Sequence, residues 1–127
     1  MPVSTAINKE QNLILHTITE YMDLSTLVET ISETLKNPDY QPGMNAIWHF
    51  HDIDKMNLSS DDLMFVVDFA SKNIDKNGKH YRLALVAEED LAYGLSRIYE
   101  AWCSDRPIII NNFRNLENAW KWVEAEK

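Results

Sequence analysis

Hydrophobic and polar positions in residues 81–113 follow the pattern of a strand, a helix and a second strand. Residues 83–87 and 108–110 are short, nearly continuous apolar runs, which predict strands buried on both faces of a parallel sheet. Apolar side chains between them recur at helical spacing and predict one buried stripe: Leu91, Leu95, Ile98 and Trp102. Because a crossover between parallel strands returns right-handedly to the same sheet, this segment predicts an α/β domain.

The rest of the chain repeats this alternation. A polar turn at residues 8–12 separates two strand patterns and predicts an N-terminal hairpin. The predicted order is β-β-α-β-α-β-α-β-α, in a single α/β domain spanning residues 1–127. Strand patterns cover residues 3–7, 13–18 and 46–50, and helical stripes cover residues 24–35, 63–70 and 116–123.

Side chains that cap helices stand in front of three of these stripes. Asp23 precedes the first stripe, and Asn115 precedes the last. Ser59 is followed three places on by Asp62, which is the spacing of a capping box. Each of these positions therefore predicts the start of a helix.

Composition and charge limit the classes of partner. The formal net charge is -8 and the pI is about 4.8, so phosphate backbones are repelled and we predict no nucleic-acid partner. No window approaches about 18 consecutive apolar residues, which predicts no membrane span. The single cysteine, Cys103, has no partner for an internal disulfide, and the N-terminus lacks an apolar stretch of signal-peptide length. We therefore predict a cytoplasmic protein.

Two segments carry the most specific sequence pattern. Residues 93–100 have the sequence YGLSRIYE, and residues 112–122 have the sequence NFRNLENAWKW. Together with the RLALV strand at residues 82–86 and the order of elements, they resemble the SpoIIAA-like (STAS/SEC14 domain-containing) bacterial family over nearly the whole chain. The resemblance implies a small mixed sheet with helices packed around it, as in anti-sigma-factor antagonists.

The same resemblance implies a candidate phosphorylation site. Antagonists of this type are switched by phosphorylation of a serine in a D-S-x-G-like turn that follows the third strand. This chain has Ser59 and Ser60 there, without the preceding acidic residue or the following glycine. The residues themselves favour N-capping by Ser59. A phosphate would be attracted by the helix N-terminus and repelled by Asp61 and Asp62.

A cluster of metal-ligand side chains lies at the end of the strand at residues 46–50. His49, His51, Asp52 and Asp54 form the pattern H-x-H-D-x-D, and imidazole with carboxylate suits zinc or iron. Strand alternation places the two histidines on one face and the two aspartates on the other, so all four converge only if the chain bends after residue 50. A polar loop is the interpretation we prefer. We predict no cofactor, with His49 and His51 as the candidate metal ligands.

The helix that begins near residue 91 contains a glycine and an arginine away from its apolar stripe. Gly94 would let a backbone or a ligand approach, and Arg97 would supply a fixed charge. In the alternative, which we favour, Gly94 permits close helix packing and Arg97 pairs with an acidic residue such as Glu100.

Four tryptophans in 127 residues add candidates for a pocket or an interface. Trp102 and Trp120 lie on stripes that we expect to be buried. Trp48 faces one side or the other of its strand, and Trp122 lies off the stripe of the last helix. We therefore expect Trp48 or Trp122 to line a pocket or an interface.

The motifs G-x-S-x-G, P-loop and G-x-G-x-x-G are absent, which disfavours hydrolases and nucleotide enzymes. We predict a non-enzymatic regulatory or protein-interaction module of the SpoIIAA-like type. The alternative is a module that binds a small apolar or lipid-like ligand, suggested by the SEC14-like naming of the family, and an enzyme ranks third. A cavity of a few hundred Å³ lined by Trp48, Tyr93 or Trp102 would favour a ligand, whereas a solid core with an exposed aromatic patch would favour a partner protein.

A homodimer is a possible assembly of this chain, and its net charge predicts which kind of contact would hold the two copies together. Two copies with a net charge of -8 repel each other, so association would use an exposed apolar helix or edge strand. Salt should then strengthen the association, because it screens the repulsion and leaves apolar contact intact. Trp122 is the residue we expect at such a contact.

Overall fold

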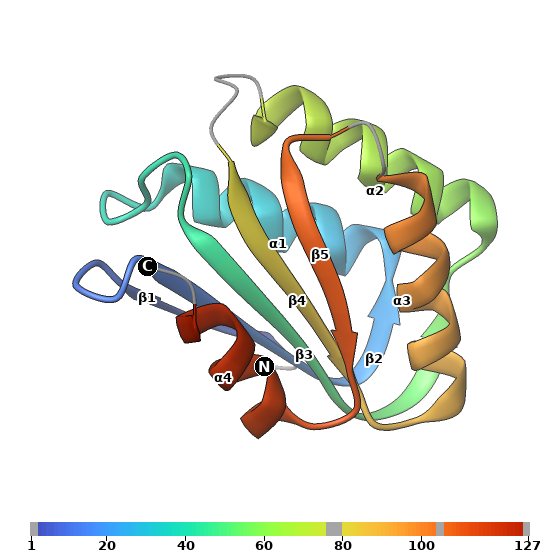
Figure 1. Cartoon of the computed structure of the whole chain (residues 1–127). Helices are drawn as coiled ribbons and strands as arrows, with labels where there is room; N and C mark the ends of the chain where they lie inside the picture. Colours follow the sequence, from blue (N-terminus) through green and yellow to red (C-terminus); the bar gives the residue numbers. More distant parts are fainter. Residues whose placement is uncertain (1–2, 76–79, 104–105, 126–127) are drawn as a thin grey trace.

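The computed structural model describes residues 3–75, 80–103 and 106–125 (Figure 1). In this part of the chain a five-stranded sheet and four helices follow the order β-β-α-β-α-β-α-β-α, which confirms the predicted fold class. The elements are β1 (Val3–Asn8), β2 (Leu13–Asp23), α1 (Leu24–Lys36), β3 (Asn45–Asn57), α2 (Ser60–Asn73), β4 (Tyr81–Ala87), α3 (Asp90–Trp102), β5 (Ile108–Phe113) and α4 (Leu116–Ala125).

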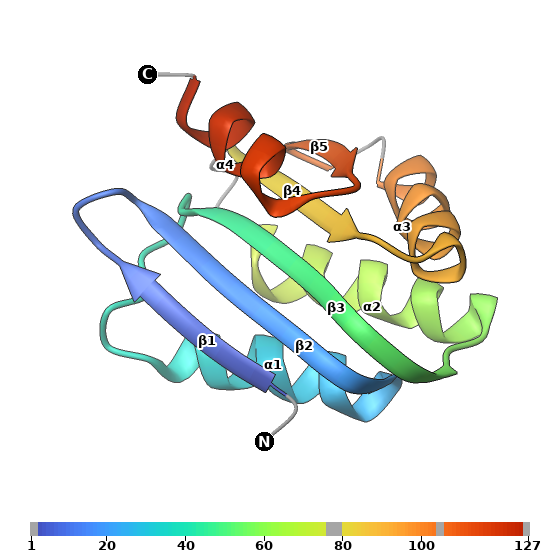
Figure 2. The same cartoon turned by 90° about the horizontal axis from the view of Figure 1, so that it is seen from below.

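The strands lie in the sheet in chain order, β1-β2-β3-β4-β5. β1 pairs antiparallel with β2 as the predicted hairpin, and the other pairs are parallel. Because successive parallel strands are neighbours, right-handed crossovers place α1, α2 and α3 on one face of the sheet. α4 follows the last strand and covers the opposite face (Figure 2).

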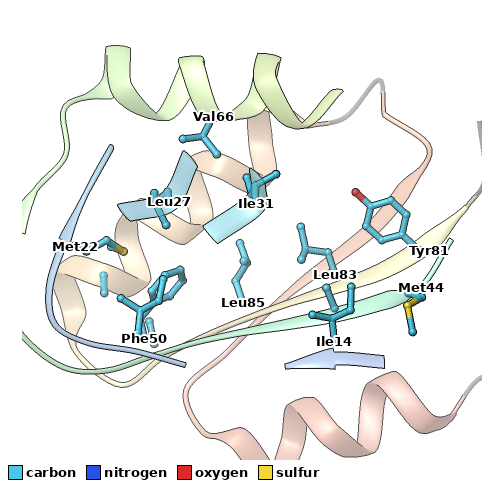
Figure 3. Close-up of a cluster of buried hydrophobic side chains, with 14 residues drawn as sticks. Ile14, Met22, Leu27, Ile31, Met44, Phe50, Val66, Tyr81, Leu83 and Leu85 are labelled. Carbon is cyan, nitrogen blue, oxygen red and sulfur yellow. The ribbon is translucent and has the colours of Figure 1, made fainter. Parts of the chain in front are cut away.

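Each face of the sheet has its own core. Beneath α1, α2 and α3, side chains such as Ile14, Phe50 and Leu85 form the larger cluster (Figure 3). Beneath α4, a smaller cluster forms around Ile47 and Val86. Residues 83–87 are buried throughout, because β4 is an inner strand that contributes alternate side chains to both clusters. The prediction for this strand is confirmed.

The second strand of the central unit differs from its prediction. Ile109 is exposed, and Ile108 and Ile110 are only partly buried. β5 is an edge strand with β4 as its one neighbour in the sheet, so its apolar run is not enclosed on both faces. The prediction of a strand at residues 108–110 is therefore confirmed, and the prediction that this strand is buried on both faces is wrong.

The apolar stripe of α3 also lies elsewhere than predicted. Leu91 is 63% exposed and Ile98 is 40% exposed, while Ala92 and Ser96 are the buried side chains of the helix. The small side chains let α3 lie close to the sheet, and they sit roughly a quarter-turn around the helix from the predicted stripe. Trp102, also predicted to be buried, is only partly buried. Leu95 is partly buried and lines the space between the helices and the sheet, so this chain covers the predicted stripe only in part and leaves Leu91 and Ile98 exposed.

The predicted helix caps are confirmed. The Asp23 carboxylate accepts a hydrogen bond from the Thr26 N–H, and the Asn115 side chain accepts one from the Asn118 N–H, both at 2.9 Å. Ser59 and Asp62 form a complete capping box: the Ser59 hydroxyl accepts from the Asp62 N–H at 3.1 Å, and the Asp62 carboxylate accepts from the Ser59 N–H at 3.0 Å.

Replacing Ser59 with alanine should therefore lower the free energy of unfolding by about 0.5 to 2 kcal/mol, because one backbone donor of α2 loses its partner. Urea denaturation of both proteins measures the difference. Ser60→Ala is the matched control, since the hydroxyl of Ser60 takes no part in the cap, and it should change stability by less than about 0.5 kcal/mol. Equal effects of the two substitutions would contradict the capping role.

Candidate functional site

The most exposed apolar surface of the described residues lies on α2 and α3. These neighbouring helices pack against each other on the same side of the sheet (Figure 1). Leu91 and Ile98 project from α3, and Met64 and Phe65 project from α2, where Phe65 stacks on Phe69 with ring centroids 6.3 Å apart. Isolated exposed apolar residues are common, but several large apolar side chains exposed on two neighbouring helices indicate a contact surface.

Gly94 and Arg97 border this stripe. A Cβ added to Gly94 would meet no atom within 4 Å, so the expected close packing at this glycine is wrong. The Arg97 Nε lies 3.9 Å from the Glu100 carboxylate, which is the weak pairing we favoured. Tyr93 points to another part of the protein, because the guanidinium of Arg114 lies 4.0 Å above its ring centroid. Gly94 and Arg97 are thus accessible to a partner, whereas the Tyr93 ring is already in contact with Arg114.

An apolar cavity of about 100 Å³ lies between the sheet and the three helices that cover it. Trp48 contributes to its lining, on the face of β3 that points toward α1, α2 and α3, whereas Tyr93 and Trp102 do not. Trp48 also packs on His16, with ring centroids 4.1 Å apart. The cavity is smaller than the roughly 300 to 1,000 Å³ of most ligand pockets.

One residue that lines this cavity, Arg106, forms a buried ion pair with Asp75. The side chains of Arg106 and Asp75 are only 6% and 4% exposed, and the Arg106 Nε donates to the Asp75 carboxylate at 2.5 Å. The remaining guanidinium N–H groups donate to the same carboxylate, to the hydroxyls of Tyr81 and Tyr99 and to the Cys103 sulfur. All five donors of Arg106 are therefore in use, and none remains for the carboxylate of a ligand.

Burial sets the protonation of the groups around Arg106. It raises the pKa of Tyr99 to about 12 and raises the pKa of Tyr81 further still. Burial also raises the pKa of the Cys103 thiol, although the neighbouring guanidinium of Arg106 acts in the opposite direction. Cys103 is therefore a protonated thiol inside the protein, which disfavours a role as a nucleophile.

The two histidines of the H-x-H pattern come together with a residue that the sequence analysis missed. The rings of His49 and His51 lie on one face of β3 with centroids 5.2 Å apart. Glu88, immediately after β4, places its carboxylate beside both: Oε1 is 2.9 Å from Nδ1 of His51, and Oε2 is 3.9 Å from Nε2 of His49. Only the pairing of β3 with β4 reveals this third residue, because Phe50 and Ala87 are partners in the register.

The histidine pair has unequal surroundings. Desolvation lowers the pKa of His49, and it outweighs the opposing effect of Glu88. The hydrogen bond to Glu88 raises the pKa of His51, which is more exposed. Asp52 has a φ of 51° in a region where the β2–β3 register shifts, and its carboxylate lies 3.2 Å from Nε2 of His51. The bulge explains how Asp52 reaches a histidine although alternation places it on the other face.

Trp122 and the two serines complete the predicted candidates. Trp122 packs against Phe113, and the guanidinium of Arg82 lies 4.9 Å from its ring centroid, so intramolecular contacts partly bury this tryptophan. The Ser59 hydroxyl is engaged in the cap of α2, and Ser60 is exposed in the first turn. Phosphorylation at either serine stays a prediction.

No family model matches the sequence, and no curated protein matches it. Among solved structures, the chain is similar to an uncharacterized protein of the DUF3478 family with a SpoIIAA-like fold from Shewanella loihica PV-4. The two chains share 14% sequence identity over 95% of this chain and 93% of the other, with a TM-score of 0.58. The chain therefore has a SpoIIAA-like fold, as the sequence resemblance implied. Its described helices include none that is long and apolar enough to cross a membrane.

Proposed function

We propose that this chain is a non-enzymatic regulatory or protein-interaction module of the SpoIIAA-like type, and that the outer stripe of α3 is its contact surface. The observation that carries the proposal is the exposure of Leu91 and Ile98 on a helix whose apolar residues follow a single stripe. Burying one such side chain completely is worth about 1.5 to 3 kcal/mol relative to leaving it exposed. A partner that covers the stripe would gain this free energy.

Gly94 supports the same surface from the side of the backbone. A glycine in a helix interior destabilises the helix by about 0.5 to 1 kcal/mol relative to alanine, and no packing against the described residues requires it. An exposed glycine beside an exposed apolar stripe allows a partner to approach the helix backbone closely. Arg97 and Glu100 provide polar groups at the edge of that contact.

Self-association tests the proposal directly. In sedimentation experiments we expect a reversible homodimer, and we expect added salt to strengthen it. The Debye length is about 8 Å at 0.15 M ionic strength and shortens as salt is added, so the repulsion between two chains of net charge -8 is screened. The double substitution Leu91→Ser and Ile98→Ser should abolish the dimer without unfolding the protein, since both side chains are exposed.

Matched substitutions separate α3 from the other candidate surfaces. Ile109→Ser removes an isoleucine of edge strand β5 whose exposure, 55%, lies between those of Ile98 and Leu91, and Trp122→Ala tests the contact expected from the sequence. Both variants should retain the dimer. A monomer under all conditions, or a dimer that Ile109→Ser or Trp122→Ala removes while the α3 variant retains it, would contradict the proposal.

A small apolar ligand is the second candidate function, and the cavity beside Trp48 is the observation that favours it. A cavity of about 150 Å³ lined by apolar side chains can hold benzene, so a volume of about 100 Å³ suits only a very small molecule and not a lipid chain. Native mass spectrometry of the purified protein tests this function. A bound small molecule in a strictly monomeric protein would favour it over the contact surface on α3.

A further inference from the structure

We propose that His49, His51 and Glu88 form a binding site for a divalent transition-metal ion, with Zn²⁺ as the ion that fits the ligand set best. One ligand atom from each of these residues lies within 4.8 Å of the others. The proposal does not depend on the contact surface of α3, because it uses different side chains, two in the middle of β3 and one immediately after β4.

The fold brings these three residues together by strand geometry. Residues two apart on a strand point to the same face, which aligns His49 with His51. The parallel register ends with the pair Phe50 and Ala87, so the residues that follow them in the chain, His51 and Glu88, also meet. Two of the ligands thus lie in β3 and the third directly follows β4, so the pairing of these strands holds the three residues close together.

Small side-chain movements would complete the coordination. Zinc binds histidine nitrogen and carboxylate oxygen at about 2.0 to 2.2 Å in a tetrahedral arrangement, so neighbouring ligand atoms should lie roughly 3.3 Å apart. The Glu88 oxygens already lie 2.9 Å and 3.9 Å from nitrogens of His51 and His49. His51 and Glu88 are partly exposed and free to adjust, whereas His49 is mostly enclosed and provides a fixed position.

The unpaired nitrogen of His49 supports a ligand at this point. Its Nε2 is buried and has no hydrogen-bond partner among the described residues. Buried polar atoms are normally paired, and each exception calls for an explanation. A metal ion held between His49 and Glu88 would give this nitrogen the partner that the protein does not supply.

The surrounding charges also favour a cation. The Asp52 carboxylate beside Nε2 of His51 would hold that ring with its other nitrogen toward the ion, as carboxylates commonly do for metal-binding histidines. The nearby cation, Arg114, donates to the backbone carbonyl of Glu88 and to Asp90, so two protein carbonyl and carboxylate oxygens already hold it. Three protein ligands on a tetrahedral ion leave one position open to water or to another molecule.

Calorimetric titration of zinc chloride into the chelator-treated full chain tests the site. We expect one ion per chain, and a rise in the thermal unfolding temperature that depends on zinc concentration, because the ion binds the folded state. Glu88→Gln and His49→Asn should each weaken binding about tenfold or more, since even substitutions behind the ligands commonly cost that much. Glu88→Gln is the decisive variant, because its exposed side chain keeps its shape.

Two control substitutions distinguish this site from general binding to acidic or histidine side chains. Glu89→Gln removes the adjacent carboxylate, and His80→Asn removes an exposed histidine that immediately precedes β4, at the far end of that strand from Glu88. His80→Asn should bind zinc as the wild type does, and Glu89→Gln should lose much less affinity than Glu88→Gln, because its charge acts on His51 but it is not one of the three clustered ligands. Absence of saturable binding, wild-type affinity in Glu88→Gln, or an equal loss in a control variant would overturn the proposal.

Discussion

Arg106→Met should lower the free energy of unfolding by about 3 to 5 kcal/mol, the largest effect we expect from a single substitution in this protein. Removing the guanidinium leaves the Asp75 carboxylate buried without its cation, and the desolvation of an unpaired charge is what makes such substitutions costly. The hydroxyls of Tyr81 and Tyr99 and the sulfur of Cys103 lose a donor at the same time.

Urea denaturation of a double-mutant cycle measures this coupling. Asp75→Leu alone should also be strongly destabilising. The double variant Asp75→Leu and Arg106→Met should lose much less stability than the sum of the two single losses, because neither charge is then left unpaired. Arg97→Met is the matched control, since its exposed guanidinium makes only a 3.9 Å contact, and it should change stability by less than about 0.5 kcal/mol. Additive losses in the cycle would contradict the ion pair as the source of the effect.

The sequence predicted those features of the fold that depend on neighbours along the chain. The cap at Ser59 and the buried face of α2 were both predicted, because a capping box and a helical stripe are local patterns. The burial of residues 83–87 followed from an apolar run that only an inner strand tolerates. The element order then restricted the topology to few alternatives.

Features that depend on contacts between distant segments were not predictable in the same way. Periodicity identifies the apolar stripe of α3, but it does not indicate whether this chain or a partner covers Leu91 and Ile98. Glu88 joins the two histidines only through the register of β3 and β4. The pairing of Arg106 with Asp75 connects residues 31 positions apart, on opposite sides of β4 in the sequence. Sequence spacing contains no signal for either encounter.

His16 should make the protein less stable in mild acid. Burial lowers its pKa from the ordinary value of 6.5 to about 4, and its Nδ1 is 2.9 Å from the hydroxyl of Thr5 on the neighbouring strand. Between those two pKa values the unfolded chain binds a proton at this histidine and the folded chain does not. Stability therefore falls as the pH is lowered through this window. At 1.36 kcal/mol per pKa unit, the difference between the two pKa values corresponds to a loss of about 3 kcal/mol in the free energy of unfolding.

Comparison with a variant that cannot titrate isolates this contribution. His16→Gln retains a polar side chain that can still bond to Thr5, and it keeps every other ionisable group of the protein. Urea denaturation at neutral pH and at a pH just above 4 gives the free energy of unfolding of both proteins. The advantage of wild type over the variant should shrink by about 2 to 3 kcal/mol on acidification. Parallel pH profiles would mean that buried His16 does not titrate as its surroundings require, and that the acid sensitivity arises from the carboxylates instead.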